Sequence, residues 1–201
     1  VKTVSWENNT LSIIDQTLLP TEYRIIELTT VQEVWDAIKI LKVRGAPAIG
    51  VCAALGILVA LRERKPDTFE QSLETVEAAA SFLATSRPTA VNLFWALDRM
   101  QQAANDYSGD RTPEAFFDYI EAQALAIYEE DRELCRTIGR NGAPLITSGS
   151  GVLTHCNAGG LATADYGTAL AVMFAAHEQG TRFHVFADET RPLLQGARLT
   201  A

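Results

Sequence analysis

One stretch near the carboxyl end limits the possible folds more than any other. Residues 152–155 form a short apolar run, small residues follow at 157–160, and an apolar helical pattern extends from about 165 to 178. A second apolar run at 182–186 completes a strand–helix–strand unit. Two strands joined by a helical crossover run parallel, and parallel sheets bind ligands where their strands end. The pattern predicts an α/β domain with a site at that edge.

Cys156 lies at the end of the first of these strands, directly before the glycine-rich turn. Backbone N–H groups at a turn that opens a helix suit a bound anion and favour the anionic form of a thiol. Cys156 is therefore a candidate catalytic residue, with a small buried residue at a strand end as the alternative. His155 precedes it, but neighbouring strand residues point to opposite faces of a sheet, which favours a structural role for His155.

The rest of the chain predicts a different organisation. Short strands at 3–7 and 11–15 flank an Asn-Asn pair that tolerates positive φ, and a third strand follows at 23–28. Apolar periodicity then predicts five helices. The first spans 31–41 with Thr29 or Thr30 as its cap, and the second spans 49–61. The third begins at residue 69, the fourth follows Thr89 as its cap, and the fifth spans 113–140. We therefore expect an α/β protein with two domains. A β-hairpin and a helical bundle occupy residues 1–145. Residues 146–201 form the beginning of a Rossmann-like parallel-sheet domain, which is truncated.

Two of the loops that precede predicted helices contain an arginine that could bind an anion. Arg44 and Gly45 precede the apolar helix that has Pro47 in its first turn, so this loop is a second possible anion cradle. The alternative is a tight interhelical turn with a surface arginine. Arg87 lies between two predicted helices, where it is either solvated or within reach of a phosphate.

Composition narrows the classes of partner and compartment. A net charge of −8 argues against nucleic acid, although a small anionic ligand needs only a local site. Cys52, Cys135 and Cys156 fit no zinc spacing and indicate reduced thiols of a cytoplasmic protein. The helix predicted at 49–61 is too short to cross a bilayer, and the polar N-terminus resembles no signal peptide. We expect no metal site and no membrane partner.

Five motifs then occur in order along the chain: VRGAPAIG at 43–50, SRPTAVNL at 86–93, THCNAG at 154–159, YGTA at 166–169 and ETRPLLQGARLT at 189–200. Together they resemble the methylthioribose-1-phosphate isomerase family of methionine salvage, within the superfamily of the initiation factor 2B regulatory subunits. The resemblance covers nearly the whole chain. It implies an aldose–ketose isomerase, an intramolecular oxidoreductase that converts 5-methylthioribose 1-phosphate into 5-methylthioribulose 1-phosphate. It also implies a homodimer that uses no metal or cofactor.

The resemblance assigns roles to individual residues. In the family a cysteine, matched by Cys156, and an aspartate open the sugar ring and move hydrogen between carbons. Contacts to the sugar phosphate match Arg44, Gly45, Ala46, Arg87 and Gln195. The family's catalytic aspartate and an Asn-Lys pair lie beyond Ala201, and Asp188 is not at the matching position. We therefore expect this chain to be an N-terminal portion that is inactive alone.

Two other functions stay open at this point. One is a related isomerase that acts on ribose 1,5-bisphosphate, although Gln195 and the motif around Cys156 favour the methylthio substrate. The other is a non-catalytic regulatory subunit of the exchange-factor type that binds a sugar phosphate or nucleotide as a signal. The match at 156–159 speaks against the regulatory subunit.

Overall fold

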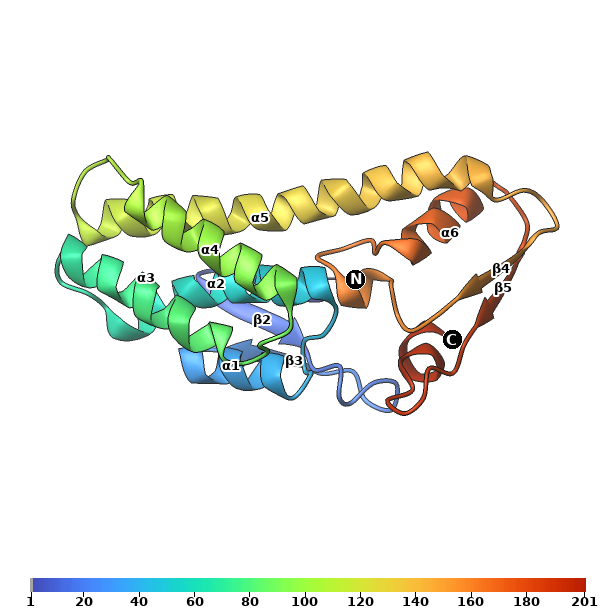
Figure 1. Cartoon of the computed structure of the whole chain (residues 1–201), viewed down its shortest axis with the longest axis horizontal. Helices are drawn as coiled ribbons and strands as arrows, with labels where there is room; N and C mark the ends of the chain where they lie inside the picture. The colour runs from blue at the N-terminus through green and yellow to red at the C-terminus, as the bar shows by residue number, and fades with distance from the viewer. Residues whose placement is uncertain (1) are drawn as a thin grey trace.

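The structure is a computed structural model that describes residues 2–201. It has the mixed α/β architecture that the sequence predicts, with helices and a small antiparallel sheet in one part and a parallel strand pair in the other (Figure 1). The elements are β1 Val4–Glu7, β2 Thr10–Ile14, β3 Ile25–Leu28, α1 Val31–Lys39, α2 Ala46–Arg64, α3 Phe69–Ala84, α4 Val91–Asn105, α5 Pro113–Gly142, η1 Ala143–Leu145, β4 Gly151–Thr154, η2 Gly160–Ala162, α6 Ala169–Glu178, β5 His184–Ala187 and η3 Gly196–Thr200.

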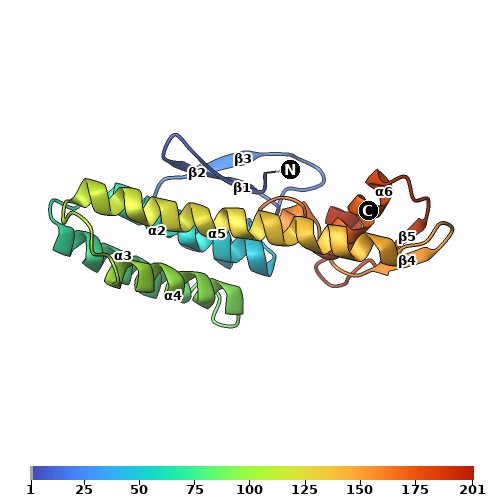
Figure 2. The ribbon, with the colours of Figure 1, turned by 90° about the horizontal axis from the view of Figure 1, so that it is seen from above.

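The N-terminal strands form the antiparallel sheet β1-β2-β3. Asn8 and Asn9 take φ values of 50° and 59°, so the predicted hairpin turn is confirmed. The third strand begins at Ile25 rather than at residue 23, because Ile25 pairs with Ile14, the last residue of β2. Figure 2 shows this sheet on one side of α2 and α5, with α3 and α4 on the other.

Helix α2 is the centre of the core, and every residue from Ala48 to Leu61 is buried. It packs against helices α1, α3, α4 and α5 and against the sheet. Its glycines let neighbours come close: a Cβ on Gly50 would lie 2.9 Å from the Asn92 carbonyl oxygen. The predicted helix at 49–61 was too short. The observed helix has 19 residues, and its most apolar 18-residue stretch has a mean hydropathy of 1.7, so by length and composition it could cross a membrane. However, 78% of that stretch is buried inside the protein. Such burial is typical of a core helix.

The predicted helix caps have mixed outcomes. Thr30, one of the two residues predicted as the cap, is the N-cap of α1, and it forms a capping box with Glu33. Thr89 does not cap α4, because the Ala90 N–H donates to the Arg87 carbonyl oxygen. That turn makes Ala90 the N-cap, and its side chain makes no capping hydrogen bond.

The carboxyl part contains the predicted strand–helix–strand unit. Strands β4 and β5 pair in parallel, with Val152 opposite Val185, and α6 packs against the last turns of α5. Helix α6 begins at Ala169 rather than at about 165, because Gly167 has a φ of 92° and bridges to Gly159. Residues 159–167 therefore form a compact loop. Since α5 contacts both parts of the molecule, a domain boundary at residue 145 stays a prediction.

Candidate active site

The loop before α2 joins the two parts of the molecule. Gly45 has a φ of 91°, and a Cβ built on it would lie 2.5 Å from the Cα of Ala162 in η2. Only glycine combines this backbone conformation with so close a neighbour. The loop that carries Arg44 is thereby seated directly against the carboxyl part.

The residues predicted to contact a sugar phosphate line one cavity of about 490 Å³. It lies between the beginning of α2, the connection into α4 and the segment around residue 194. Five of its lining residues are the ones that the family resemblance picked out: Arg44, Gly45, Ala46, Arg87 and Gln195. The fold thus brings together positions that lie up to 151 residues apart (195 minus 44). Their roles toward a substrate stay predictions.

Arg44 supplies a half-buried positive charge to this cavity. Its Nη2 donates to the Asn157 carbonyl oxygen at 2.9 Å, whereas its Nη1 is buried and has no hydrogen-bond partner among residues 2–201. Burial lowers the pKa of the Arg44 guanidinium below its ordinary value. The nearby Cys156 thiol acts in the opposite direction, and Arg87 adds to the lowering. A bound anion would supply the missing acceptor and offset the repulsion between the two arginines.

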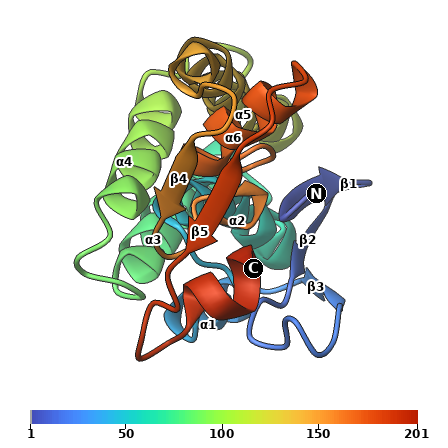
Figure 3. The same ribbon diagram turned by 90° about the vertical axis from the view of Figure 1, so that its right-hand side faces the viewer.

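Cys156 lies where the parallel strands end and directly precedes Asn157, whose carbonyl oxygen accepts a hydrogen bond from Arg44 of the cavity. It follows β4 with a φ of 62°, a conformation that residues other than glycine adopt rarely. Figure 3 shows the segment that ends at the C-terminus beneath the ends of β4 and β5. The sequence prediction placed a helix start beside Cys156, and this is wrong because α6 begins only at Ala169. The positive group near the thiol is Arg44.

The predicted structural role of His155 stays a prediction. Its ring is exposed, and its Nδ1 lies 3.0 Å from Oδ2 of Asp188 at the end of β5. Because the chain leaves the strand at residue 155, alternation along a sheet no longer decides where this side chain points. His155 and Asp188 form a polar pair at the same strand ends as Cys156.

Sequence reasoning missed the side chains that hold the Cys156 turn. They are Asn157, Thr190 and Thr200, whose hydrogen bonds link the 156–157 turn to the last twelve residues of the chain, 190–201. Thr190 and Thr200 lie inside the motif at 189–200, and nothing in the sequence distinguished their hydroxyls from those of surface threonines. Arg198 fastens the same segment to the amino-terminal part, with its Nη2 2.8 Å from the Leu19 carbonyl oxygen.

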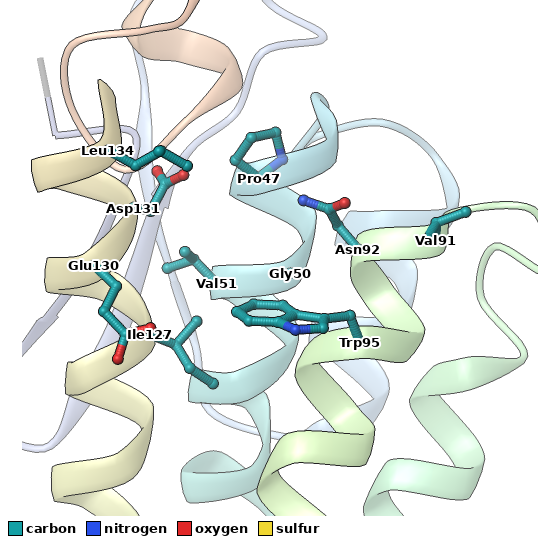
Figure 4. A pocket seen from close by; sticks show the side chains of 10 residues that line it. All are labelled: Pro47, Gly50, Val51, Val91, Asn92, Trp95, Ile127, Glu130, Asp131 and Leu134. Atoms are coloured by element: carbon teal, nitrogen blue, oxygen red, sulfur yellow. The ribbon is translucent and has the colours of Figure 1, made fainter. Parts of the chain in front are cut away.

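Two further cavities adjoin the site. One of about 530 Å³ shares Arg44 and Gln195 with it and is also lined by Arg198. The other, of about 400 Å³, lies between α2, α4 and α5, where the Trp95 indole extends across the groove (Figure 4). It contains none of the residues predicted to contact substrate. Within residues 2–201, no group of three or more His, Cys, Asp or Glu side chains is placed to hold a metal ion.

The fold and this site define a class of protein. Residues 42–201 match the model of the initiation factor 2 subunit family (IF-2B), and the chain belongs to that family. It is 53% identical over 200 residues to a protein of Geotalea uraniireducens named methylthioribose-1-phosphate isomerase, with 100% of this chain and 58% of the relative covered. It is 54% identical to a protein of Moorella thermoacetica named 5-deoxyribose 1-phosphate isomerase, with 98% and 56% covered.

Solved structures agree with these sequence relatives. The structure of 5-methylthioribose 1-phosphate isomerase from Pyrococcus horikoshii superposes with a TM-score of 0.93 at 41% identity, over 100% of this chain and 56% of that one. A structure described as translation initiation factor eIF-2B subunit delta from A. fulgidus has a TM-score of 0.90 at 46% identity, over 100% and 58%. The chain therefore spans less than two thirds of the length of these relatives.

Proposed function

We propose that this chain is the amino-terminal part of an aldose–ketose isomerase that converts 5-methylthioribose 1-phosphate into 5-methylthioribulose 1-phosphate in methionine salvage. One observation carries the proposal: Arg44, Arg87 and Gln195 line one cavity, and Arg44 donates a hydrogen bond to the residue that follows Cys156. The name of the relative that is 53% identical supports the same reaction.

The chemistry explains why such a cavity is needed. A phosphate on C1 locks the sugar in its ring form, so a general acid must protonate the ring oxygen before hydrogen can move between C1 and C2. In the proposal Arg44 and Arg87 bind the phosphate, with the unpaired Nη1 of Arg44 as one donor. We propose that the Cys156 thiol acts at the reacting end and that Gln195, which lines the cavity, provides a further polar contact.

A second candidate substrate is 5-deoxyribose 1-phosphate. The Moorella thermoacetica relative that carries this name is 54% identical, as close to this chain as the methylthioribose-1-phosphate isomerases. Both sugars need the same ring opening and the same phosphate contacts, and they differ only in the group on C5. Relative kcat/KM values for the two substrates distinguish these candidates.

The proposal extends to the assembly and the missing residues. In the proposal the catalytic aspartate that the family resemblance implies belongs to the part of the relatives that this chain does not cover, so the 201-residue chain is inactive by itself and its parent protein is active. The parent is a cytoplasmic homodimer that needs no metal or cofactor. The part up to residue 145 folds as one domain, and residues 146–201 begin the second.

The test is turnover of methylthioribose 1-phosphate by the chain and by its parent, together with the intact mass of the parent. We expect a longer, active parent and an inert short chain. In the parent, Cys156→Ala abolishes turnover while phosphate binding is retained, whereas Cys135→Ala, at a buried cysteine within α5, retains both. Isomerisation by the short chain would contradict the missing aspartate. An inactive wild-type parent that still binds sugar phosphate would instead indicate a regulatory subunit.

A further inference from the structure

The backbone at Cys156 is in a conformation that must be held from outside. Its φ of 62° places the residue in the left-handed region, which costs free energy for any side chain with a Cβ. Residues persist there only when surrounding contacts determine the conformation, and such positions concentrate at functional sites. The contacts around Cys156 therefore show what keeps its thiol in place.

Two threonine hydroxyls satisfy both backbone polar groups of Cys156. Its N–H donates to Oγ1 of Thr190 at 2.8 Å, and its carbonyl oxygen accepts a hydrogen bond from Oγ1 of Thr200 at 2.7 Å. Neither threonine is a sequence neighbour, since they lie 34 and 44 residues further along. The hydroxyl of Thr190 also donates to the Asp188 carbonyl oxygen at 3.2 Å, which orients its lone pair toward Cys156.

The next residue is held from two sides. Nδ2 of Asn157 donates to Oγ1 of Thr200 at 3.1 Å and to the Leu199 carbonyl oxygen at 3.0 Å. On the other side, Arg44 donates to the Asn157 carbonyl oxygen at 2.9 Å. The turn is therefore clamped between the carboxyl segment and the arginine of the cavity.

We propose that Thr190 and Thr200 are positioning residues that hold the Cys156 thiol beside Arg44. Without their hydroxyls the turn relaxes to a negative φ, and the side chain of Cys156 leaves the guanidinium. The catalytic meaning of this placement rests on the proposed isomerase function, but the placement itself does not.

The first test measures the placement in the 201-residue chain. Iodoacetamide alkylates thiolates, and peptide mass spectrometry follows the reaction at Cys156, while alkylation of fully buried Cys52 would report loss of the fold. At pH 7 we expect Thr190→Val and Thr200→Val each to slow alkylation of Cys156 about fivefold, the factor that corresponds to the loss of one net hydrogen bond. Valine keeps the branched shape and removes the hydroxyl.

Two controls separate positioning from general damage. Thr190→Ser restores the rate because serine keeps the hydroxyl, and Thr147→Val, at an exposed threonine outside the site, leaves the rate unchanged. A rate within twofold of wild type, or a faster rate, in both valine variants would overturn the proposal. If one valine variant loses its cooperative melting transition, the other decides, because the two hydroxyls hold different backbone groups of Cys156.

The second test uses the parent protein and separates the two proposals. Thr190→Val should lower kcat about fivefold with KM for methylthioribose 1-phosphate unchanged, since phosphate contacts stay intact. A parent whose wild type shows no turnover refutes the isomerase function, while the alkylation result still decides the positioning role. An unchanged kcat in an active parent refutes the positioning role alone.

Discussion

Replacing Gly45 by alanine should disrupt the contact between the two parts of the molecule. A Cβ at this position would lie 2.5 Å from three atoms of Ala162, namely its Cα, its Cβ and its carbonyl oxygen. Two of these are backbone atoms, which cannot turn aside as the end of a long side chain can. Either the loop of Arg44 or η2 must therefore move.

The expected loss of unfolding free energy in Gly45→Ala has two parts. With φ of 91° and ψ of 133°, Gly45 lies in a region that L-residues rarely adopt, which costs an alanine about 1 to 3 kcal/mol relative to glycine. Forcing an extra methyl group into a packed contact costs about 1 to 3 kcal/mol more. Gly149 is a control for the cost of a positive φ without a close contact, because its φ is 82° and a Cβ there would have no heavy atom within 4 Å. The difference between Gly45→Ala and Gly149→Ala thus measures the close approach to Ala162.

Urea unfolding of the wild type and both variants measures these free energies. We expect Gly45→Ala to lose about 1 to 3 kcal/mol more than Gly149→Ala, and to bind inorganic phosphate more weakly because the loop moves Arg44. Equal losses in the two variants would refute the reasoning, since the contact with Ala162 would then carry no cost. A large loss with unchanged phosphate binding would show that η2, rather than the loop, gives way.

Three further predictions concern stability. Phe116→Ala, at a fully buried ring, should cost about 3 to 5 kcal/mol in urea unfolding. Thr30→Ala removes the capping box of α1 and should cost about 1 kcal/mol, with Thr147→Ala as an exposed control. Burial raises the pKa of the Asp131 carboxyl, only partly offset by the N–H of Ala164, so the folded protein binds this proton more tightly than the unfolded chain. Ionisation of the Asp131 carboxyl therefore destabilises the folded protein fully at a pH above the pKa of the folded state, and not at all at a pH below the pKa of the unfolded state. Asp131→Asn should raise Tm at pH 7 and bring no gain at about pH 3; a gain at both pH values would contradict this origin.

Local patterns predicted most of the helices and strands because these elements depend on near neighbours. Thr30 satisfies amides of its own first turn, and Asn8-Asn9 supplies the positive φ that a tight hairpin needs. The errors occurred where a distant contact overrides local preference. Helix α6 begins late because Gly167 bridges to Gly159.

The sequence by itself determined the α/β class and the two kinds of architecture along the chain, and it supplied the small set of residues that we predict to contact a sugar phosphate. These residues were predicted from the resemblance of their motifs to a known family, because spacing along the chain does not give distances in space. Only the tertiary structure decided that Arg44, Arg87 and Gln195 share one cavity, and that the charge beside Cys156 comes from Arg44 rather than from a helix start. It also decided which threonines hold the Cys156 turn. The physical reason is that a hydrogen bond or an ion pair depends on separations of a few ångströms, which packing sets between segments far apart in the chain.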